Sequence, residues 1–121
     1  MDKNRLIEAL KQSWSAETAK GDWSLDNPSQ NQCAITALVV QDYFGGDLLR
    51  CLMTDGDSHY WNRLPDGSEL DLTEAQFVQT QNKPLKDNSI VRDREYVLSF
   101  PDTATRYSLL KSKIETFIEK Q

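Results

Sequence analysis

The segment from Cys33 to Phe44 constrains the fold most, because it is apolar at most of its positions. It follows the polar, turn-rich stretch 27–32 and ends at Gly45-Gly46, a typical helix terminator. Its length and flanks predict a helix over about 32–44, with Ser29 or Asn31 as the N-cap. A helix that is apolar on most sides is expected to be the central, most buried element. Four β-branched residues mildly favour a strand instead: Ile35, Thr36, Val39 and Val40.

The composition is that of an ordinary globular protein, with 38% apolar and 27% charged residues among 121. This length suits one domain over residues 1–121. The net charge of −5, without a cluster of basic residues, disfavours nucleic acid and membrane surfaces as partners. No segment reaches the roughly 20 apolar residues of a membrane span. Residues 1–5 lack the apolar core of a secretory signal, so we expect a cytoplasmic protein.

The remaining elements are predicted from periodicity and turn residues. A first helix over 2–14 is capped by Asp2, and Trp23 and Leu25 pin the polar loop 15–32 to the body. Strands are expected over 47–53, 58–64 and 68–72, followed by a short helix over 73–77 with a Thr-x-x-Gln capping box. A polar loop over 79–90 precedes a short helix over 93–99, with an edge strand over 96–98 as the alternative. Asp102 caps a C-terminal helix whose buried stripe is Tyr107, Leu110, Ile114 and Phe117.

Together these elements predict an α+β fold. Its central helix packs on a three- or four-stranded antiparallel sheet, and further helices lie at the N- and C-terminal ends of the chain.

The turn at residues 65–67, Pro-Asp-Gly, fits a three-residue hairpin loop with glycine at the left-handed position. That loop pairs Asn62 with Leu70 across the two strands. His59 then lies on the same face as Asp71 and diagonal to it, about 7–8 Å away. A two- or four-residue loop would put the two side chains on opposite faces. The turn chemistry therefore predicts that the chain's one histidine meets an acidic side chain.

Cys33, His59 and Asp71 form a candidate nucleophilic triad. The start of a helix carries roughly half a positive charge, which favours a thiolate at Cys33. His59 is the candidate general base, and Asp71 would fix its tautomer. Each residue also has a plain structural interpretation. Cys33 and His59 are of types often found packed in cores, and Asp71 is placed to cap the short helix that follows.

An acyl-transfer site also needs donors for the developing oxyanion. The Cys33 N–H is one candidate, and a side-chain amide is the second, supplied by Gln32, Gln30, Asn31 or Asn27. Trp61 is either a wall of the substrate pocket or a core aromatic. The other cysteine, Cys51, is expected to be a core residue. We expect both cysteines to be reduced, with a disulfide between them as the alternative. No cysteine or histidine spacing matches a zinc site, so we expect no metal and no cofactor.

Several long segments carry a family resemblance: 27–34, 37–46, 59–64, 69–77, 101–103 and 106–110. They resemble the YunG-like family of small, largely uncharacterised bacterial proteins, in which Cys33, His59 and Asp71 stand at the family's Cys, His and Asp positions. That resemblance implies no particular reaction. The order and layout of the three residues also resemble the core of papain-like and transglutaminase-like enzymes.

We therefore expect a cysteine-dependent acyl-transfer enzyme: an amidase, peptidase, deamidase or transferase acting on a small molecule or peptide. The alternative is a non-catalytic binding or regulatory domain on the same scaffold.

Overall fold

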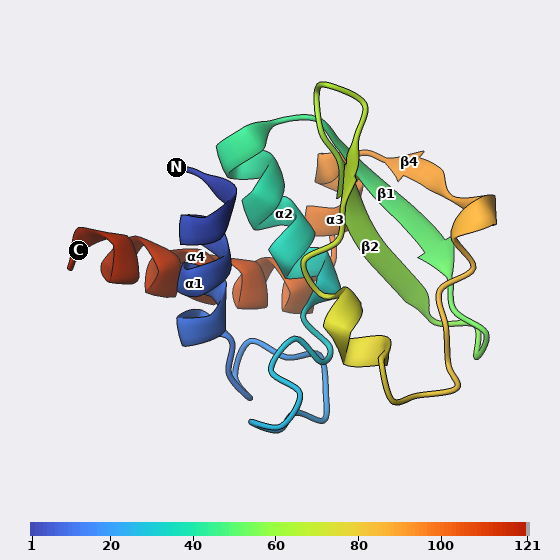
Figure 1. Cartoon of the computed structure of the whole chain (residues 1–121), viewed down its shortest axis with the longest axis horizontal. Helices are drawn as coiled ribbons and strands as arrows, with labels where there is room; N and C mark the ends of the chain where they lie inside the picture. Colours follow the sequence, from blue (N-terminus) through green and yellow to red (C-terminus); the bar gives the residue numbers. More distant parts are fainter. Residues whose placement is uncertain (121) are drawn as a thin grey trace.

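The computed structural model describes residues 1–120 and has an α+β architecture. It contains four helices and a four-stranded antiparallel sheet, with two helices before the strands in sequence and two after them (Figure 1). The helices are α1 (Lys3–Ser13), α2 (Cys33–Phe44), α3 (Arg94–Leu98) and α4 (Pro101–Glu119). The strands are β1 (Asp47–Leu52), β2 (Ser58–Arg63), β3 (Glu69–Leu70) and β4 (Ile90–Arg92). Two short 3₁₀ helices, η1 (Glu74–Phe77) and η2 (Lys86–Asn88), lie between β3 and β4 in sequence.

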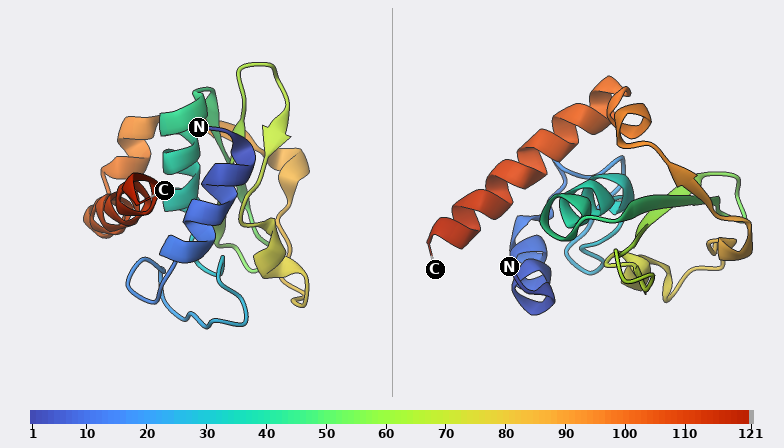
Figure 2. Two further views of the ribbon diagram at one scale, coloured as in Figure 1. Left: turned by 60° about the vertical axis from the view of Figure 1, so that its left-hand side comes forward. Right: turned by 90° about the horizontal axis from the view of Figure 1, so that it is seen from above.

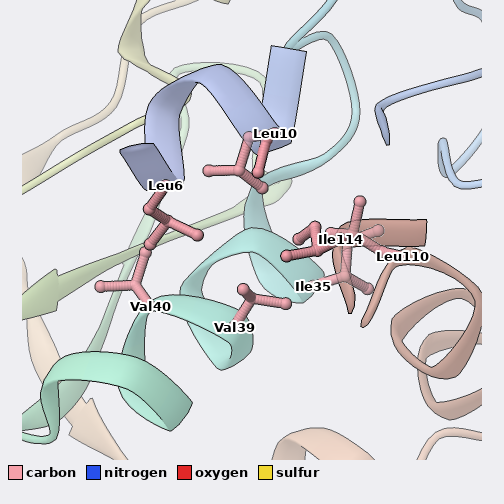
Figure 3. Close-up of a cluster of buried hydrophobic side chains, with 8 residues drawn as sticks. Leu6, Leu10, Ile35, Val39, Val40, Leu110 and Ile114 are labelled. Atoms are coloured by element: carbon pink, nitrogen blue, oxygen red, sulfur yellow. The ribbon is translucent and has the colours of Figure 1, made fainter. Parts of the chain in front are cut away.

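Helix α2 is the central element, as its apolar composition predicts. It packs against β2 on one side and α4 on the other, and α1 also packs on α4 (Figure 2). Side chains from α1, α2 and α4 converge in one buried cluster (Figure 3). Burying each of these side chains contributes about 1.5–3 kcal/mol, which fixes α2 in place. The labelled members are Leu6, Leu10, Ile35, Val39, Val40, Leu110 and Ile114.

The C-terminal end of α2 joins the sheet through two glycines with positive φ. Gly45 adopts φ 75° and its N–H donates to the Gln41 carbonyl, which ends the helix. Gly46 adopts φ 83°, and a Cβ there would overlap the carbonyl oxygen of Arg63. Only glycine therefore permits β1 to start this close to the end of β2.

The hairpin register agrees with the prediction from the turn. The strand order is β3-β2-β1-β4, and Asn62 pairs with Leu70. The Leu64 N–H donates to the Ser68 carbonyl at 2.7 Å, and Gly67 has φ 90° as the three-residue loop requires. Strand β3 is shorter than predicted, so Asp71 lies just beyond it.

Several predictions about local structure are wrong. The N-cap of α2 is Gln32 rather than Ser29 or Asn31, and α4 begins after Phe100, with Asp102 inside its first turn. The capping box over 73–77 does not form, and Leu25 is 82% exposed rather than pinned to the body. Other predictions are confirmed. Asp2 caps α1, and residues 94–98 form a helix rather than a strand.

Within residues 1–120, no helix is both long and apolar enough to cross a membrane.

Candidate active site

Cys33 is the first residue of α2, so its side chain lies at the positive end of the central helix. The residue is half-buried and carries a free thiol. It lines a cavity of about 210 Å³ that His59 also lines. The N–H groups in the first turn of a helix have no acceptor within that helix, so they are free for an incoming anion. The predicted meeting of cysteine, histidine and helix start is therefore present in the structure.

His59 lies on β2, opposite Cys51 of β1, and its side chain is fully buried. Its Nε2 atom is 2.7 Å from Oδ2 of Asp71. The ring stacks on Trp61 with centroids 5.6 Å apart, and it meets the ring of Phe77 edge-on at 4.9 Å. These contacts fix the plane of the imidazole.

The other ring nitrogen of His59 is Nδ1. It is buried and has no hydrogen-bond partner in the part of the chain that the structure describes. Cys33 lines the same cavity as His59, and its thiol is close enough to be one of the groups that raise the pKa of the imidazole. Since Nε2 is occupied by Asp71, Nδ1 is the nitrogen left to exchange a proton with the thiol.

Asp71 contacts His59 as the hairpin register predicts, but it does not cap η1, whose N-cap is Thr73. Its side chain is only 4% exposed. Oδ2 bonds to His59, while Oδ1 accepts hydrogen bonds from the backbone N–H of Thr73 at 3.1 Å and from its hydroxyl at 3.3 Å. Asp71 thus orients the imidazole and also holds the turn that leads into η1.

Lys86 completes the Asp71 site, and no local pattern in the sequence predicts this contact. Its Nζ lies 2.9 Å from Oδ2 of Asp71 and 4.9 Å from the centre of the Trp61 ring. Lys86 reaches this position because the backbone of Leu85 bonds to Leu52 at the end of β1. That contact is tertiary, so local sequence patterns do not report it.

The charged groups of this cluster shift one another's pKa values. Burial alone would lower the pKa of His59, but the hydrogen bond with Asp71 and the proximity of Cys33 raise that pKa from 6.5 to about 9. Burial would raise the pKa of Asp71, but His59 and Lys86 hold it below its ordinary value. A protonated His59 imidazole therefore pairs with an ionised Asp71 carboxylate.

The four predicted amide donors lie in different places. Gln32 is buried, with its side chain bonded to Thr18 and to the Ser15 carbonyl, and it does not line the cavity of Cys33. Asn27 donates to the backbone carbonyl of Gln76. Gln30 and Asn27 line a neighbouring cavity of about 420 Å³ that lacks Cys33 and His59.

Asn31 is the one predicted amide that lines the Cys33 cavity. Its φ is 60°, its side chain donates to the Asp22 carbonyl, and its backbone N–H donates to the side chain of Gln76. Gln76 also lines this cavity. The sequence prediction placed that glutamine in a capping box and so missed its place in the site.

Trp61 is a buried aromatic that supports His59 rather than a wall of the cavity. It is 2% exposed, and its Nε1 donates to Oε1 of Glu69 at 2.7 Å. It is absent from the lining of the 210 Å³ cavity.

Neither cysteine forms a disulfide, and Cys51 is buried in the core as predicted. Across residues 1–120, no three histidine, cysteine or acidic side chains cluster closely enough to hold a metal ion.

A second cavity also borders the cysteine, and His59 does not line it. It measures about 360 Å³ and adjoins the first cavity, with which it shares Lys20, Cys33, Ala34, Ser58 and Arg106. Three aromatic residues line it, Tyr60 from β2, Tyr96 from α3, and Phe100 before α4, together with charged side chains such as Arg50 and Asp102. Cys33 therefore borders two adjoining cavities, one with His59 and one with aromatic side chains.

The fold and the site together define a class of protein: a small α+β protein with a helix-start cysteine beside a buried histidine–aspartate pair. The chain belongs to the YunG protein family, whose sequence model matches residues 2–119. It is 37% identical over 86 residues to a Bacillus subtilis (strain 168) protein described as "Uncharacterized protein YunG". That alignment covers 71% of this chain and 69% of the relative. No solved structure matches the chain.

Proposed function

We propose that this protein is a cysteine-dependent acyl-transfer enzyme, with Cys33 as nucleophile, His59 as general acid and base, and Asp71 as positioning residue. One observation carries the proposal. His59 is held by Asp71 through Nε2 at 2.7 Å, while its buried Nδ1 is left unpaired, among residues 1–120, beside Cys33. A histidine that served packing alone would gain from satisfying both nitrogens, because an unmade buried hydrogen bond costs about 1–3 kcal/mol.

The reaction follows from these positions. Cys33 Sγ, as thiolate, attacks the carbonyl carbon of an amide, ester or thioester, and the C=O electron pair moves onto oxygen. When the tetrahedral intermediate collapses, the bond to the leaving group breaks, and the leaving atom takes the proton from Nδ1 of His59. Water or an amine then gives a proton to Nδ1 and attacks the thioester, which releases the product and restores the thiolate. Asp71 keeps a hydrogen on Nε2 throughout.

The layout also supports a papain-like or transglutaminase-like arrangement, in which a cysteine at a helix start meets a histidine and an acid from neighbouring strands. Cys33 opens α2, His59 lies on β2, and Asp71 follows β3 directly. This likeness concerns order and placement and does not extend to a substrate.

The two cavities beside Cys33 indicate how a substrate would be oriented in the site. The leaving group needs a proton from His59, so it belongs in the cavity that His59 lines. The acyl group then belongs in the adjoining cavity, where Tyr60, Tyr96 and Phe100 offer aromatic surface. We therefore propose an acyl donor with an apolar or aromatic acyl group and a leaving group that accepts a proton.

The full burial of His59 favours a second candidate, a non-catalytic binding or regulatory domain on the same scaffold. In that case the histidine would be a packed core residue and Cys33 an inert thiol.

Intact-mass spectrometry of purified protein separates the two candidates. Wild type and Cys33→Ala are incubated with activated acyl donors, such as p-nitrophenyl esters, and with small-molecule cell extract. The enzyme proposal predicts an acyl adduct on wild type that Cys33→Ala lacks, while Cys51→Ala, which changes the buried cysteine, still forms it. The absence of any adduct on wild type would reject the enzyme proposal.

A further inference from the structure

We propose that the side chain of Gln76 supplies the second donor of the oxyanion site, together with the backbone N–H of Cys33. This inference rests on the proposed acyl-transfer function. It assigns the role to a residue outside the four amides that the sequence suggested, and it follows from where one buried amide group points.

The orientation of the Gln76 amide is fixed by its neighbour. The backbone N–H of Asn31 donates to Oε1 of Gln76 at 3.1 Å. A backbone N–H can only donate, so the atom that it meets must be the amide oxygen, and the NH₂ group must point the other way. The backbone of Gln76 is held as well, because Asn27 Nδ2 donates to its carbonyl at 3.1 Å.

The NH₂ group of Gln76 is buried and unused. Within residues 1–120, Nε2 has no hydrogen-bond acceptor although it is shielded from solvent. Leaving such a donor unpaired costs about 1–3 kcal/mol, so it calls for an explanation. The unpaired Nε2 group is explained if it binds an oxygen that is present only during the reaction. Catalytic donors are positioned to stabilise charge that develops in the transition state.

Gln76 borders the cavity in which such an oxygen would form. It lines the cavity of about 210 Å³ that Cys33 and His59 line. The next residue, Phe77, packs its ring on the imidazole of His59 at 4.9 Å. The other donor, the N–H of Cys33, lies in the first turn of α2 and has no acceptor within the helix. One donor thus comes from the nucleophile's own backbone and the other from η1.

Two reactions of the same thiol test this role. Acylation by p-nitrophenyl acetate passes through a tetrahedral oxyanion, whereas alkylation by iodoacetamide is a direct displacement at carbon and forms none. Gln76→Met removes the donor and stays neutral. Gln76→Glu keeps an oxygen for the Asn31 N–H and so preserves that bond. Gln79→Met is the matched control, since Gln79 is exposed and lies three residues further along.

The rate of acylation divided by the rate of alkylation is the quantity compared. Loss of one oxyanion donor slows acyl transfer by about 10²–10³-fold, so this ratio should fall by about 10²-fold in both Gln76 variants and stay at the wild-type value in Gln79→Met. An unchanged ratio in both Gln76 variants would overturn the role of Gln76 and leave the acyl-transfer proposal standing. A wild-type Cys33 that p-nitrophenyl acetate does not acylate would overturn both.

Discussion

Replacing Asp71 by asparagine should lower the pKa of His59 substantially. The substitution keeps the size of the side chain and removes its charge. In the wild-type protein, burial lowers the pKa of His59, while the hydrogen bond to Asp71 and the proximity of Cys33 raise it from 6.5 to about 9. That difference corresponds to about 3 kcal/mol in favour of the imidazolium. Because Asp71 is the largest of the raising influences, the pKa of His59 should fall to near or below 6.5 in Asp71→Asn.

NMR titration of the imidazole carbon-bound protons gives this pKa directly. His59 is the chain's one histidine, so a single set of signals reports it. Asp87→Asn is the matched control, because Asp87 is an exposed aspartate next to Lys86 and its loss makes the same change in net charge. A wild-type His59 that titrates near 6.5, or an Asp71→Asn variant that titrates with the wild type, would refute the reasoning.

The same shift predicts how stability depends on pH. The pKa of His59 is higher in the folded chain than its ordinary value, so its protonation stabilises the fold. This contribution is fully present below pH 6.5 and is lost as the pH rises to about 9. Urea unfolding across that range should show the wild type losing up to about 3 kcal/mol and His59→Gln losing much less. A wild type whose stability is constant over this range would contradict the assignment.

Three further predictions address the surroundings of the site. Lys86→Met should raise the pKa of His59 above the wild-type value, because the variant lacks the cation that shares Oδ2 of Asp71 with the imidazole. The same NMR titration measures this pKa, and a lower value would contradict the role of Lys86. Gly46→Ala should lose about 1–3 kcal/mol or more in urea unfolding, because its φ is 83° and a Cβ would meet the Arg63 carbonyl; an unchanged midpoint would contradict that crowding. Phe100→Ala should slow acylation by a phenylacetyl ester more than by an acetyl ester, as measured by intact mass, whereas equal slowing would argue against the aromatic cavity as the acyl site.

The hairpin and the long helices were predictable because their signals are local. Pro65-Asp66-Gly67 sets the length of one turn, and that length fixes which face His59 shares with Asp71. The apolar run after Cys33 likewise marks the central helix, because a helix that is apolar on most sides must be covered by other elements.

The caps were not predictable because polar side chains near a helix start have several possible partners. Ser29 donates to the Thr73 carbonyl, and Asn31 bonds to Asp22 and Gln76, so neither caps α2. Asp102 bonds to Arg106 within α4 instead of capping the helix. Each of these outcomes depends on a neighbour that the local sequence does not reveal.

The rest of the site depends on contacts between distant segments. Strand β4 has only three residues and pairs with β1 at the edge of the sheet, so no alternating pattern marks it. Lys86 reaches Asp71 only because the chain returns alongside β1 before β4. The side chain of Gln76 is held at the cavity by a hydrogen bond from the backbone N–H of Asn31, which lies 45 positions away in the chain. A single sequence does not predict which side chains such long-range contacts bring into the site.

The central claim is that His59 activates Cys33, and the rate of Cys33 alkylation by iodoacetamide at pH 6 tests it most directly. A free thiol with an ordinary pKa is only ~0.3% thiolate at that pH. Intact-mass time courses would compare wild type, His59→Gln and an unstructured cysteine peptide, with Cys33→Ser reporting the buried Cys51. If His59 activates Cys33, wild type should react faster than the peptide, and His59→Gln should lose this advantage. A wild-type Cys33 that reacts no faster than the peptide, at a rate unaffected by His59→Gln, would show that His59 does not activate the thiol.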